Sequence, residues 1–342
     1  MMTTRLVPWL IVASLGVGGI AGYQVMQWAA APAASQSDTP PPKIVLVPEG
    51  ASFQQVAALL EREQLIKSRS AFLLLGKAND ADRKIRPGEY EFNPSMLPAE
   101  ILAKLVSGRV VLHQVTIPEG FTMAQIAETL GERGLVDQAE FLRLAQDREF
   151  IRTLGIEADS LEGYLFPDTY RFARRTKARD ALRVLVDNLW QVFTPELRER
   201  AKQVNLSIHE VLTLASVIEK ETSVDEERSL ISAVFHNRLR KNIPLQSDPT
   251  VIYGLAASFD GNLRRQDLDN KSPYNTYRVK GLPPGPIASP GARSIRAALY
   301  PAPAPYLYFV SRNDGTHQFS STLEEHNRAV EKYQRRPFRR VS

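Results

Sequence analysis

The sequence contains no cysteine, which excludes disulfide bonds and thiolate metal sites. Its five histidines form no His-Glu-x-x-His pair and show no other spacing typical of metal ligands. The chain also lacks a nucleophile elbow, a phosphate-binding loop and any Cys-x-x-Cys pair. Basic and aromatic residues do not interleave as they do in nucleic-acid readers. We therefore predict no metal, no cofactor and no nucleic-acid partner.

Neither sign of charge dominates the sequence. The 43 basic and 38 acidic residues leave a formal net charge of +5 at pH 7. This mild excess could favour an anionic polymer or lipid surface, but solubility alone accounts for it. A hydrophobic fraction of 43% and a charged fraction of 24% are typical of globular proteins. With 342 residues, the chain has room for two or more domains.

Charged side chains are absent from residues 6–36. Leu6–Trp28 is apolar and exceeds the roughly 20 residues that a helix needs to cross a bilayer. We therefore predict a cytoplasmic stub and a single transmembrane helix over residues 1–28, with the rest of the chain exported. The alternative is a cleaved signal peptide, with Ala29–Ala31 as the cleavage site.

A flexible linker and an internal repeat follow. Residues 29–42 are rich in Ala, Pro and Ser, which is typical of a tether. The segment Val47–Gly50 recurs as Ile117–Gly120, and the positions after each copy align without a gap. Each copy predicts a strand, a turn and an amphipathic helix, with Ser52 and Thr122 as the helix caps. Two copies are too few for a solenoid, so we expect a pair of small modules.

Helical patterns dominate the second half of the chain until about Pro244, and loops rich in Pro, Gly, Asn and Tyr follow it. A shorter helix, ending at Gly108, is expected in the first half. The predicted helices cover residues 97–107, 177–192, 195–204, 208–222 and 229–240.

Two carboxylates lie at the end of one of these apolar helices. Leu214, Val217, Ile218 and Glu221 share a helix face by the i, i+3, i+4, i+7 rule, whereas Glu219 points to roughly the opposite side. An apolar, partly dry wall raises the pKa of a carboxyl group and keeps it protonated near neutral pH, as a general acid requires. Helix geometry leaves a second interpretation open, in which Glu221 is a boundary residue with its carboxylate in solvent.

Several motifs together resemble the YceG-like family of endolytic murein transglycosylases. No single motif is specific, but together they cover nearly the whole chain beyond the linker. The matching segments are Glu162–Tyr170, Ala215–Thr222, Phe235–Leu239, Leu245–Gly254, Tyr274–Tyr277, Gly281–Gly285 and Pro305–Val310, followed by His317 and Phe319.

The resemblance implies a lytic cleavage of peptidoglycan without a second catalytic carboxylate. A single Glu, here Glu221, protonates the leaving oxygen, and the C6 hydroxyl of the same N-acetylmuramic acid attacks C1 to give a 1,6-anhydro product. Glu219 and Asp168 are expected to be supporting residues, and Glu219 to be structural or ion-paired. The candidate substrate-binding residues are Thr222, Gln246, Asp248, Tyr274, Asn275 and Tyr277. Thr222 is also a candidate for orienting the carboxyl group.

The resemblance also implies an architecture and a cellular setting. The expected fold class is α+β, with the transmembrane helix, two small LysM-like modules at 43–109 and 110–155, and a mostly helical, lysozyme-like catalytic domain at 156–342. The expected location is the inner membrane, near peptidoglycan synthases, where the enzyme would set glycan strand length. The modules could bind glycan or act only as spacers.

Two rival functions remain open. The first is a muramidase that uses water, with Asp248 as its base. The second is a non-catalytic, membrane-tethered scaffold that binds peptidoglycan.

Overall fold

The computed structural model describes residues 24–34 and 40–335. The chain divides into two compact units. The first unit ends at His113 and also includes residues 173–175, and the second comprises residues 114–172 and 176 onward.

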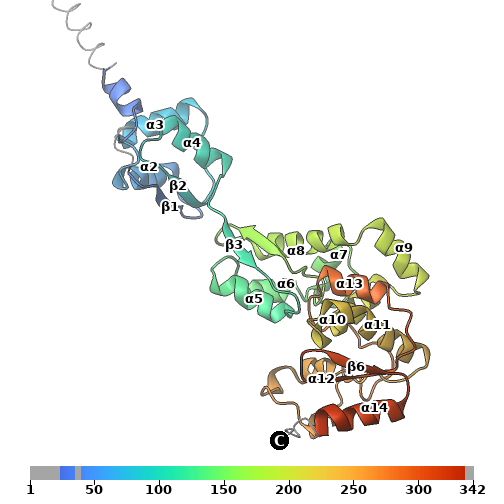
Figure 1. The fold of residues 1–342 in the computed structure, drawn as a ribbon. Helices are drawn as coiled ribbons and strands as arrows, with labels where there is room; N and C mark the ends of the chain where they lie inside the picture. The colour runs from blue at the N-terminus through green and yellow to red at the C-terminus, as the bar shows by residue number, and fades with distance from the viewer. Residues whose placement is uncertain (1–23, 35–39, 336–342) are drawn as a thin grey trace, which may run out of the picture. The chain divides into compact units, whose positions relative to one another are not determined.

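The first unit builds one small core between a two-stranded sheet and three helices (Figure 1). Its elements are β1 (Lys43–Val47), α2 (Phe53–Arg62), α3 (Arg69–Ala78), β2 (Gly88–Phe92) and α4 (Pro98–Ser107). The strands are antiparallel, with Val45 opposite Tyr90 and Lys43 opposite Phe92. Alternate residues of each strand are buried, as expected of a sheet that is covered on one face.

The second copy of the repeat opens the second unit. It contains β3 (His113–Thr116), α5 (Met123–Glu132), α6 (Gln138–Leu144), α7 (Arg148–Thr153) and β4 (Thr169–Phe172), and β3 pairs with β4. The predicted caps are confirmed, because Ser52 and Thr122 each accept a hydrogen bond from the backbone N–H three residues later. Gly50 and Gly120 both have left-handed backbones, with φ of 75° and 77°, which explains why each copy has glycine before its helix.

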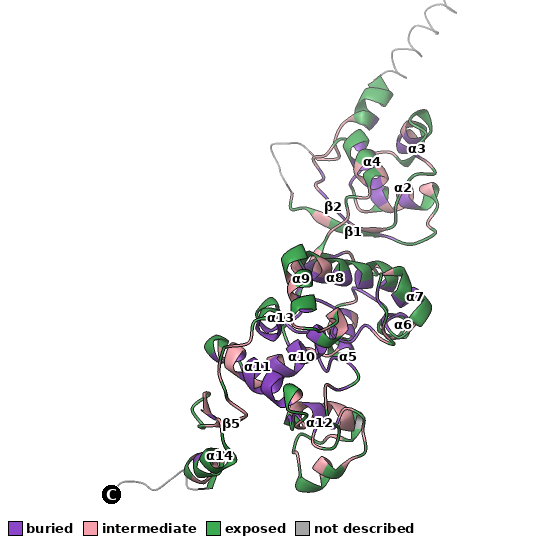
Figure 2. Cartoon of the chain, turned by 90° about the vertical axis from the view of Figure 1, so that its right-hand side faces the viewer, coloured by how far each residue is buried: buried purple, intermediate pink, exposed green. Residues whose placement is uncertain are grey.

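The rest of the second unit is a helical assembly around α10. Its elements are α8 (Ala178–Val192), α9 (Pro195–Gln203), α10 (Ile208–Glu221), α11 (Asp225–Arg240), α12 (Asp248–Leu255), α13 (Ala292–Leu299), β5 (Tyr308–Ser311), β6 (His317–Ser320) and α14 (Leu323–Val330). Helix α10 packs against α9, α11, α12 and α13. Figure 2 shows α10 and α11 as largely buried.

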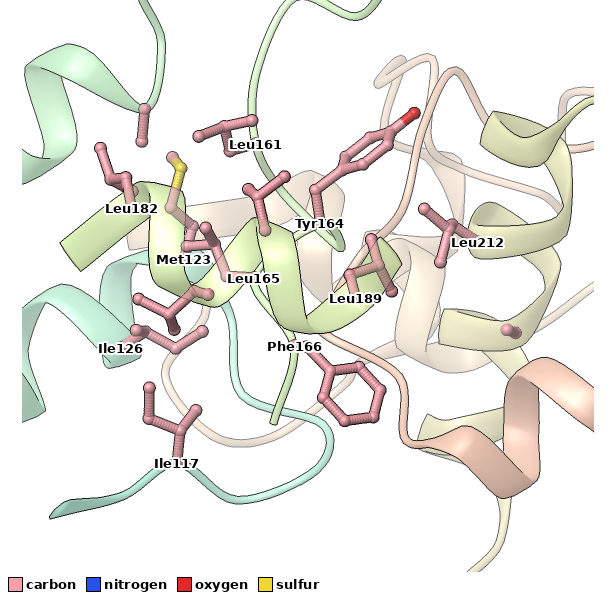
Figure 3. Packing of buried hydrophobic residues seen from close by; sticks show 14 of the residues in the cluster. Ile117, Met123, Ile126, Leu161, Tyr164, Leu165, Phe166, Leu182, Leu189 and Leu212 are labelled. Atoms are coloured by element: carbon pink, nitrogen blue, oxygen red, sulfur yellow. The ribbon is translucent and has the colours of Figure 1, made fainter. Parts of the chain in front are cut away.

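One hydrophobic core joins the second copy of the repeat to the helices that follow it. Figure 3 shows side chains from α5 and the preceding segment, such as Ile117 and Ile126, packed near Leu165 and Leu182. The division into modules at 43–109 and 110–155 and a catalytic domain at 156–342 stays a prediction.

The helix predictions are confirmed to within a few residues. Helix α4 ends at Ser107, where Gly108 takes the left-handed conformation. Helix α11 begins at Asp225, four residues before the predicted start at Ser229. Its first turn holds Asp225, Glu226 and Glu227, which the positive end of the helix dipole favours.

The predicted fold class and localisation need correction. Across residues 24–34 and 40–335, no helix is both long and apolar enough to cross a membrane. The remainder of the predicted transmembrane helix, residues 6–23, lies outside the described residues, so the transmembrane helix and the single-pass inner-membrane location are not supported. The described strands form only three two-stranded sheets, so the fold is a mixed α/β arrangement of small sheets among helices.

Candidate active site

Helix α10 carries both candidate carboxylates at its C-terminal end. Ser207 caps its first turn in a capping box with Glu210, and the helix ends at Glu221. All eight residues from 211 to 218 are buried, so α10 has no exposed face along this stretch. The expectation that one apolar stripe separates Glu221 from Glu219 is therefore wrong: the helix is buried all round, and the two carboxylates differ in their partners instead.

Glu219 lies in a buried ion pair. Its Oε1 is 3.4 Å from Nη2 of Arg228, and the two side chains are only 6% and 7% exposed. Its Oε2 accepts a 2.9 Å hydrogen bond from the backbone N–H of Gly291. Both oxygens of Glu219 are thus engaged within the protein, which leaves this carboxylate poorly suited to donating a proton.

Glu221 is half-buried and has a hydroxyl as its partner. The Oγ of Ser247 donates a 2.5 Å hydrogen bond to Glu221 Oε1. Burial raises the pKa of Glu221 from 4.5 to about 7; the negative charge of Asp248 adds to the rise, while the Ser247 hydrogen bond and the positive charge of Arg238 oppose it. A pKa near 7 leaves about half of the carboxyl groups protonated at neutral pH, which suits a group that acts as acid and then as base.

The loop that supplies Ser247 is pinned to the segment around Thr276. Gln246 has a left-handed backbone, with φ of 53°, and its N–H donates to the carbonyl of Thr276 at 3.0 Å. The N–H of Ser247 donates to Thr276 Oγ1 at 3.0 Å. These bonds fix Ser247 beside Glu221 at the start of α12.

Asp248 and Tyr277 form a second polar pair at the start of α12. The hydroxyl of Tyr277 donates to Asp248 Oδ1 at 2.6 Å. Burial and this bond raise the pKa of Tyr277, so the phenol stays protonated. Asn275 is fully buried, and its amide donates to the carbonyls of Leu268 and Asn270 at 2.9 and 2.8 Å. The geometry of Asn275 is that of a residue that fixes the loop.

Arg238, on α11, places a buried positive charge behind the site. Its side chain donates to the carbonyl oxygens of Leu307 and Leu245 at 2.7 and 2.8 Å and to Gln246 Oε1 at 3.2 Å. Sequence reasoning did not assign Arg238 a role. The available signal was its position in the matching segment Phe235–Leu239, but the sequence could not show that its partners are carbonyls rather than a carboxylate.

A hollow of about 550 Å³ lies beside Glu221. A further acid lines it, because Glu119 from the repeated Pro-Glu-Gly segment belongs to the same wall. Burial and the nearby charge of Glu219 raise the pKa of Glu119, while Arg228 and Arg293 oppose the rise. Glu119 was also missed, since nothing in the sequence brings it close to α10. The other lining residues are Gly120, Glu219, Lys220, Thr222, Ser223, Asp225, Arg228 and Arg293.

Three predicted residues form no hydrogen bond with Glu221 among the described residues. The Thr222 hydroxyl accepts a 3.0 Å bond from the N–H of Val224, so it closes the turn after α10 rather than bonding to Glu221. Asp168 accepts hydrogen bonds from the Thr169 N–H and the Asn188 amide at the start of β4. Tyr274 lines a different hollow.

The second hollow, of about 280 Å³, is lined by Glu162, His209, Tyr274 and Pro284, among others. Glu162 is only 5% exposed, and burial raises its pKa to about 7. Its carboxyl group accepts hydrogen bonds from the Met123 N–H at 2.9 Å and the Tyr253 hydroxyl at 3.2 Å. Sequence reasoning noted Glu162 only as part of a motif.

Across residues 24–34 and 40–335, no three His, Asp or Glu side chains are grouped so that they could hold a metal ion. The polar groups gathered around Glu221 are instead a carboxyl group, hydroxyls, an amide and a guanidinium. Such a set can transfer a proton and hydrogen-bond to a polyhydroxylated substrate.

The chain is similar in sequence to one protein family and to several named proteins. The model of the YceG-like family matches residues 45–332. A protein of Bacillus subtilis (strain 168) named endolytic murein transglycosylase is 36% identical over 303 residues, covering 84% of this chain and 83% of the relative. A protein of the same name from Streptococcus pneumoniae serotype 2 (strain D39) is 32% identical over 359 residues, and the match spans 94% of this chain but 63% of that relative.

The crystal structure of a yceG-like protein from Listeria monocytogenes is similar as well. It is 34% identical, with a TM-score of 0.58, and the match covers 84% of this chain and 99% of the crystallised one.

Proposed function

The chain belongs to the YceG-like family, and on this premise we propose that it is a peptidoglycan lytic transglycosylase in which Glu221 is the catalytic acid and base. The relatives named endolytic murein transglycosylase support the enzyme class and the substrate. The observation that carries the assignment of Glu221 is its environment: a half-buried carboxyl group with a pKa near 7, hydrogen-bonded to a hydroxyl and lining an open hollow.

In the proposed reaction, Glu221 first donates a proton and then accepts one. The protonated carboxyl group of Glu221 donates its proton to the oxygen that links C1 of N-acetylmuramic acid to the next sugar, and the C1–O bond breaks. The resulting carboxylate accepts the proton of the C6 hydroxyl while O6 bonds to C1. The products are a 1,6-anhydro end and a free hydroxyl on the leaving sugar, so no water is consumed.

Two carboxylates close to Glu221, those of Glu219 and Asp248, are less suited to this role. Glu219 is held by Arg228 and Gly291. Asp248 is half of the pair with Tyr277, and its charge helps to keep Glu221 protonated. We propose that Asp248, Tyr277 and Gln246 shape the loop or contact the saccharide, and that none of them changes the bond that is made.

A hydrolytic muramidase is the competing outcome, and the structure adds a candidate base for it. Glu119 lines the same hollow as Glu221 and could activate a water. Analysis of the products separates the two reactions, because the anhydro product is lighter than the hydrolytic one by one water. The purified full chain on uncrosslinked glycan is expected to yield anhydro ends, and reducing muramic acid as the main product would reject the transglycosylase.

A non-catalytic glycan-binding scaffold is tested by the variant Glu221→Gln. It keeps the shape of the side chain and lacks the acidic proton, so binding without cleavage is expected. Unchanged cleavage would reject Glu221 as the acid. Control of glycan strand length and contact with peptidoglycan synthases remain proposals that the family resemblance supports.

A further inference from the structure

The hydroxyl of Ser247 has a single strong interaction, and that interaction is with the proposed acid. Ser247 is only 2% exposed, and its Oγ lies 2.5 Å from Oε1 of Glu221. A hydroxyl has one proton to donate, and here it points at a carboxyl oxygen. Thr222, which follows Glu221 in the sequence, bonds to Val224 instead.

A closed ring of hydrogen bonds holds the backbone of Ser247. Its N–H donates to Thr276 Oγ1 at 3.0 Å, and its carbonyl accepts from Thr250 Oγ1 at 2.6 Å. Because a carbonyl cannot donate, the single hydroxyl proton of Thr250 is used there. The 2.8 Å contact between the two threonine hydroxyls must then be donated by Thr276.

The ring therefore runs in one direction and uses both threonine protons. Thr250 and Thr276 are 0% and 1% exposed, so water does not compete for these bonds. The groups that fix the backbone of Ser247, Thr250 and Thr276, form no hydrogen bond with Glu221 in the described part of the chain. Among the described residues of this loop, only the Ser247 side chain donates a hydrogen bond to Glu221.

We propose that Ser247 is the positioning residue of the catalytic acid: by donating to Oε1 it makes Oε2 the oxygen that carries the acidic proton. In a protonated carboxyl group, the oxygen that accepts from Ser247 is the carbonyl oxygen, and the proton lies on the other oxygen. Among the described residues, no side chain or backbone group forms a hydrogen bond with Oε2. This inference rests on the proposed function, since it assigns a partner to the acid of that reaction.

The hydrogen bond from Ser247 to Glu221 also affects the pH dependence of activity. A donor to a carboxylate stabilises the charged form, so removing the Ser247 hydroxyl raises the pKa of Glu221. The acid must be protonated in the first step, so activity falls as pH rises through this pKa. In Ser247→Ala, this alkaline limb is expected to shift to higher pH by about one unit.

The other charges near Glu221 stay in place in that variant. Asp248 and Arg238 act directly on its pKa. The charged groups that line the hollow are Glu119, Glu219, Lys220, Asp225, Arg228 and Arg293. In the described part of the chain, none of these side chains forms a hydrogen bond or an ion pair with Ser247. A shift of the alkaline limb of the pH–activity curve therefore measures the loss of the Ser247 hydroxyl.

The experiment measures anhydro-product formation against pH for the full chain and its variants. Ser247→Ala is expected to lose roughly 10- to 100-fold in rate at the optimum, because the acid is no longer oriented, with the alkaline limb displaced upward. Ser232→Ala is the matched control: Ser232 is also a fully buried serine, but its hydroxyl makes no hydrogen bond within the described residues. It should leave both the rate and the limb unchanged.

The outcomes separate this inference from the proposed function. If the wild type forms no anhydro product, the proposed function fails. If the wild type is active and Glu221→Gln is not, but Ser247→Ala keeps the wild-type limb and rate, only the role of Ser247 is overturned.

Two further measurements cover the remaining cases. If Ser247→Ala folds but is inactive, NMR titration of the Glu221 carboxyl group decides: a raised pKa supports the inference and an unchanged pKa overturns it. If the alanine variant does not fold, Ser247→Cys, which has a weaker donor of similar shape, is judged by the same shift of the limb.

Discussion

Replacing Glu221 by Gln should strongly lower activity and should make the protein increasingly stable, relative to the wild type, as pH rises from 4.5 to 8. The cause is that burial disfavours the charged form of Glu221. Its pKa in the folded protein is about 7, compared with 4.5 when it is freely hydrated. The folded state therefore binds this proton more tightly than the unfolded state does, and stability is lost as pH rises from 4.5 to 7.

The magnitude follows from the two pKa values. One pH unit corresponds to about 1.36 kcal/mol, so the full difference is about 3 kcal/mol of unfolding free energy. Gln does not titrate, and its side-chain oxygen still accepts from Ser247. The stability of Glu221→Gln relative to the wild type should thus rise by up to about 3 kcal/mol between pH 4.5 and pH 8.

The assay is urea denaturation of both proteins at several pH values in this range. Only the difference between the two proteins is interpreted, so the titration of Glu162, which is common to both, cancels. Activity should fall by roughly 10²- to 10⁴-fold. A stability difference that stays constant from pH 4.5 to pH 8 would show that Glu221 has an ordinary pKa, and would refute the reasoning about its environment.

Other substitutions probe neighbouring features. Glu219→Gln removes one partner of a buried ion pair and should cost about 3 kcal/mol of stability, measured by denaturation, while the folded fraction keeps most of its activity; a loss of activity equal to that of Glu221→Gln would contradict this. Asp248→Asn should raise KM or perturb the loop without changing the product, so hydrolytic product from this variant would contradict its assigned role. Asn275→Ala should lower the unfolding free energy by about 2 kcal/mol, because two backbone carbonyls lose their donors; unchanged stability would mean that this loop is not fixed by the amide. The isolated residues 43–109 should bind chitin oligomers weakly in a titration, because no aromatic ring lines the hollow beside their Pro-Glu-Gly turn, and micromolar binding would make this module a glycan receptor rather than a spacer.

Local patterns predicted the helices well because each depends on neighbouring residues. The caps at Ser52 and Thr122 and the stop at Gly108 are short-range features, and the structure confirms them. The sequence and the structure both favour Glu221 over Glu219 as the acid, but for different reasons. Helix periodicity assigned the two carboxylates to opposite faces, but α10 is buried all round, and the difference arises from Arg228, which pairs with Glu219.

The residues that were missed depend on contacts between distant parts of the chain. Ser247 lies 26 positions from Glu221, and Glu119 comes from the repeated segment, far from α10 in the sequence. Arg238 is buried among backbone carbonyls, an environment that no spacing rule predicts. The contact of Asn275 with saccharide stays a prediction; the structure adds that its amide donates to two backbone carbonyls.

The most direct test of the central claim is to digest uncrosslinked glycan with the purified full chain in water enriched in heavy oxygen. Internal attack by the C6 hydroxyl takes no oxygen from the solvent, so the new ends should be 1,6-anhydro and unlabelled, and Glu221→Gln should produce almost none of them. Reducing muramic acid ends that carry the label would show that water is the nucleophile. That result would contradict the transglycosylase mechanism and would indicate a hydrolase with a second carboxylate, Glu119 or Asp248, as its base.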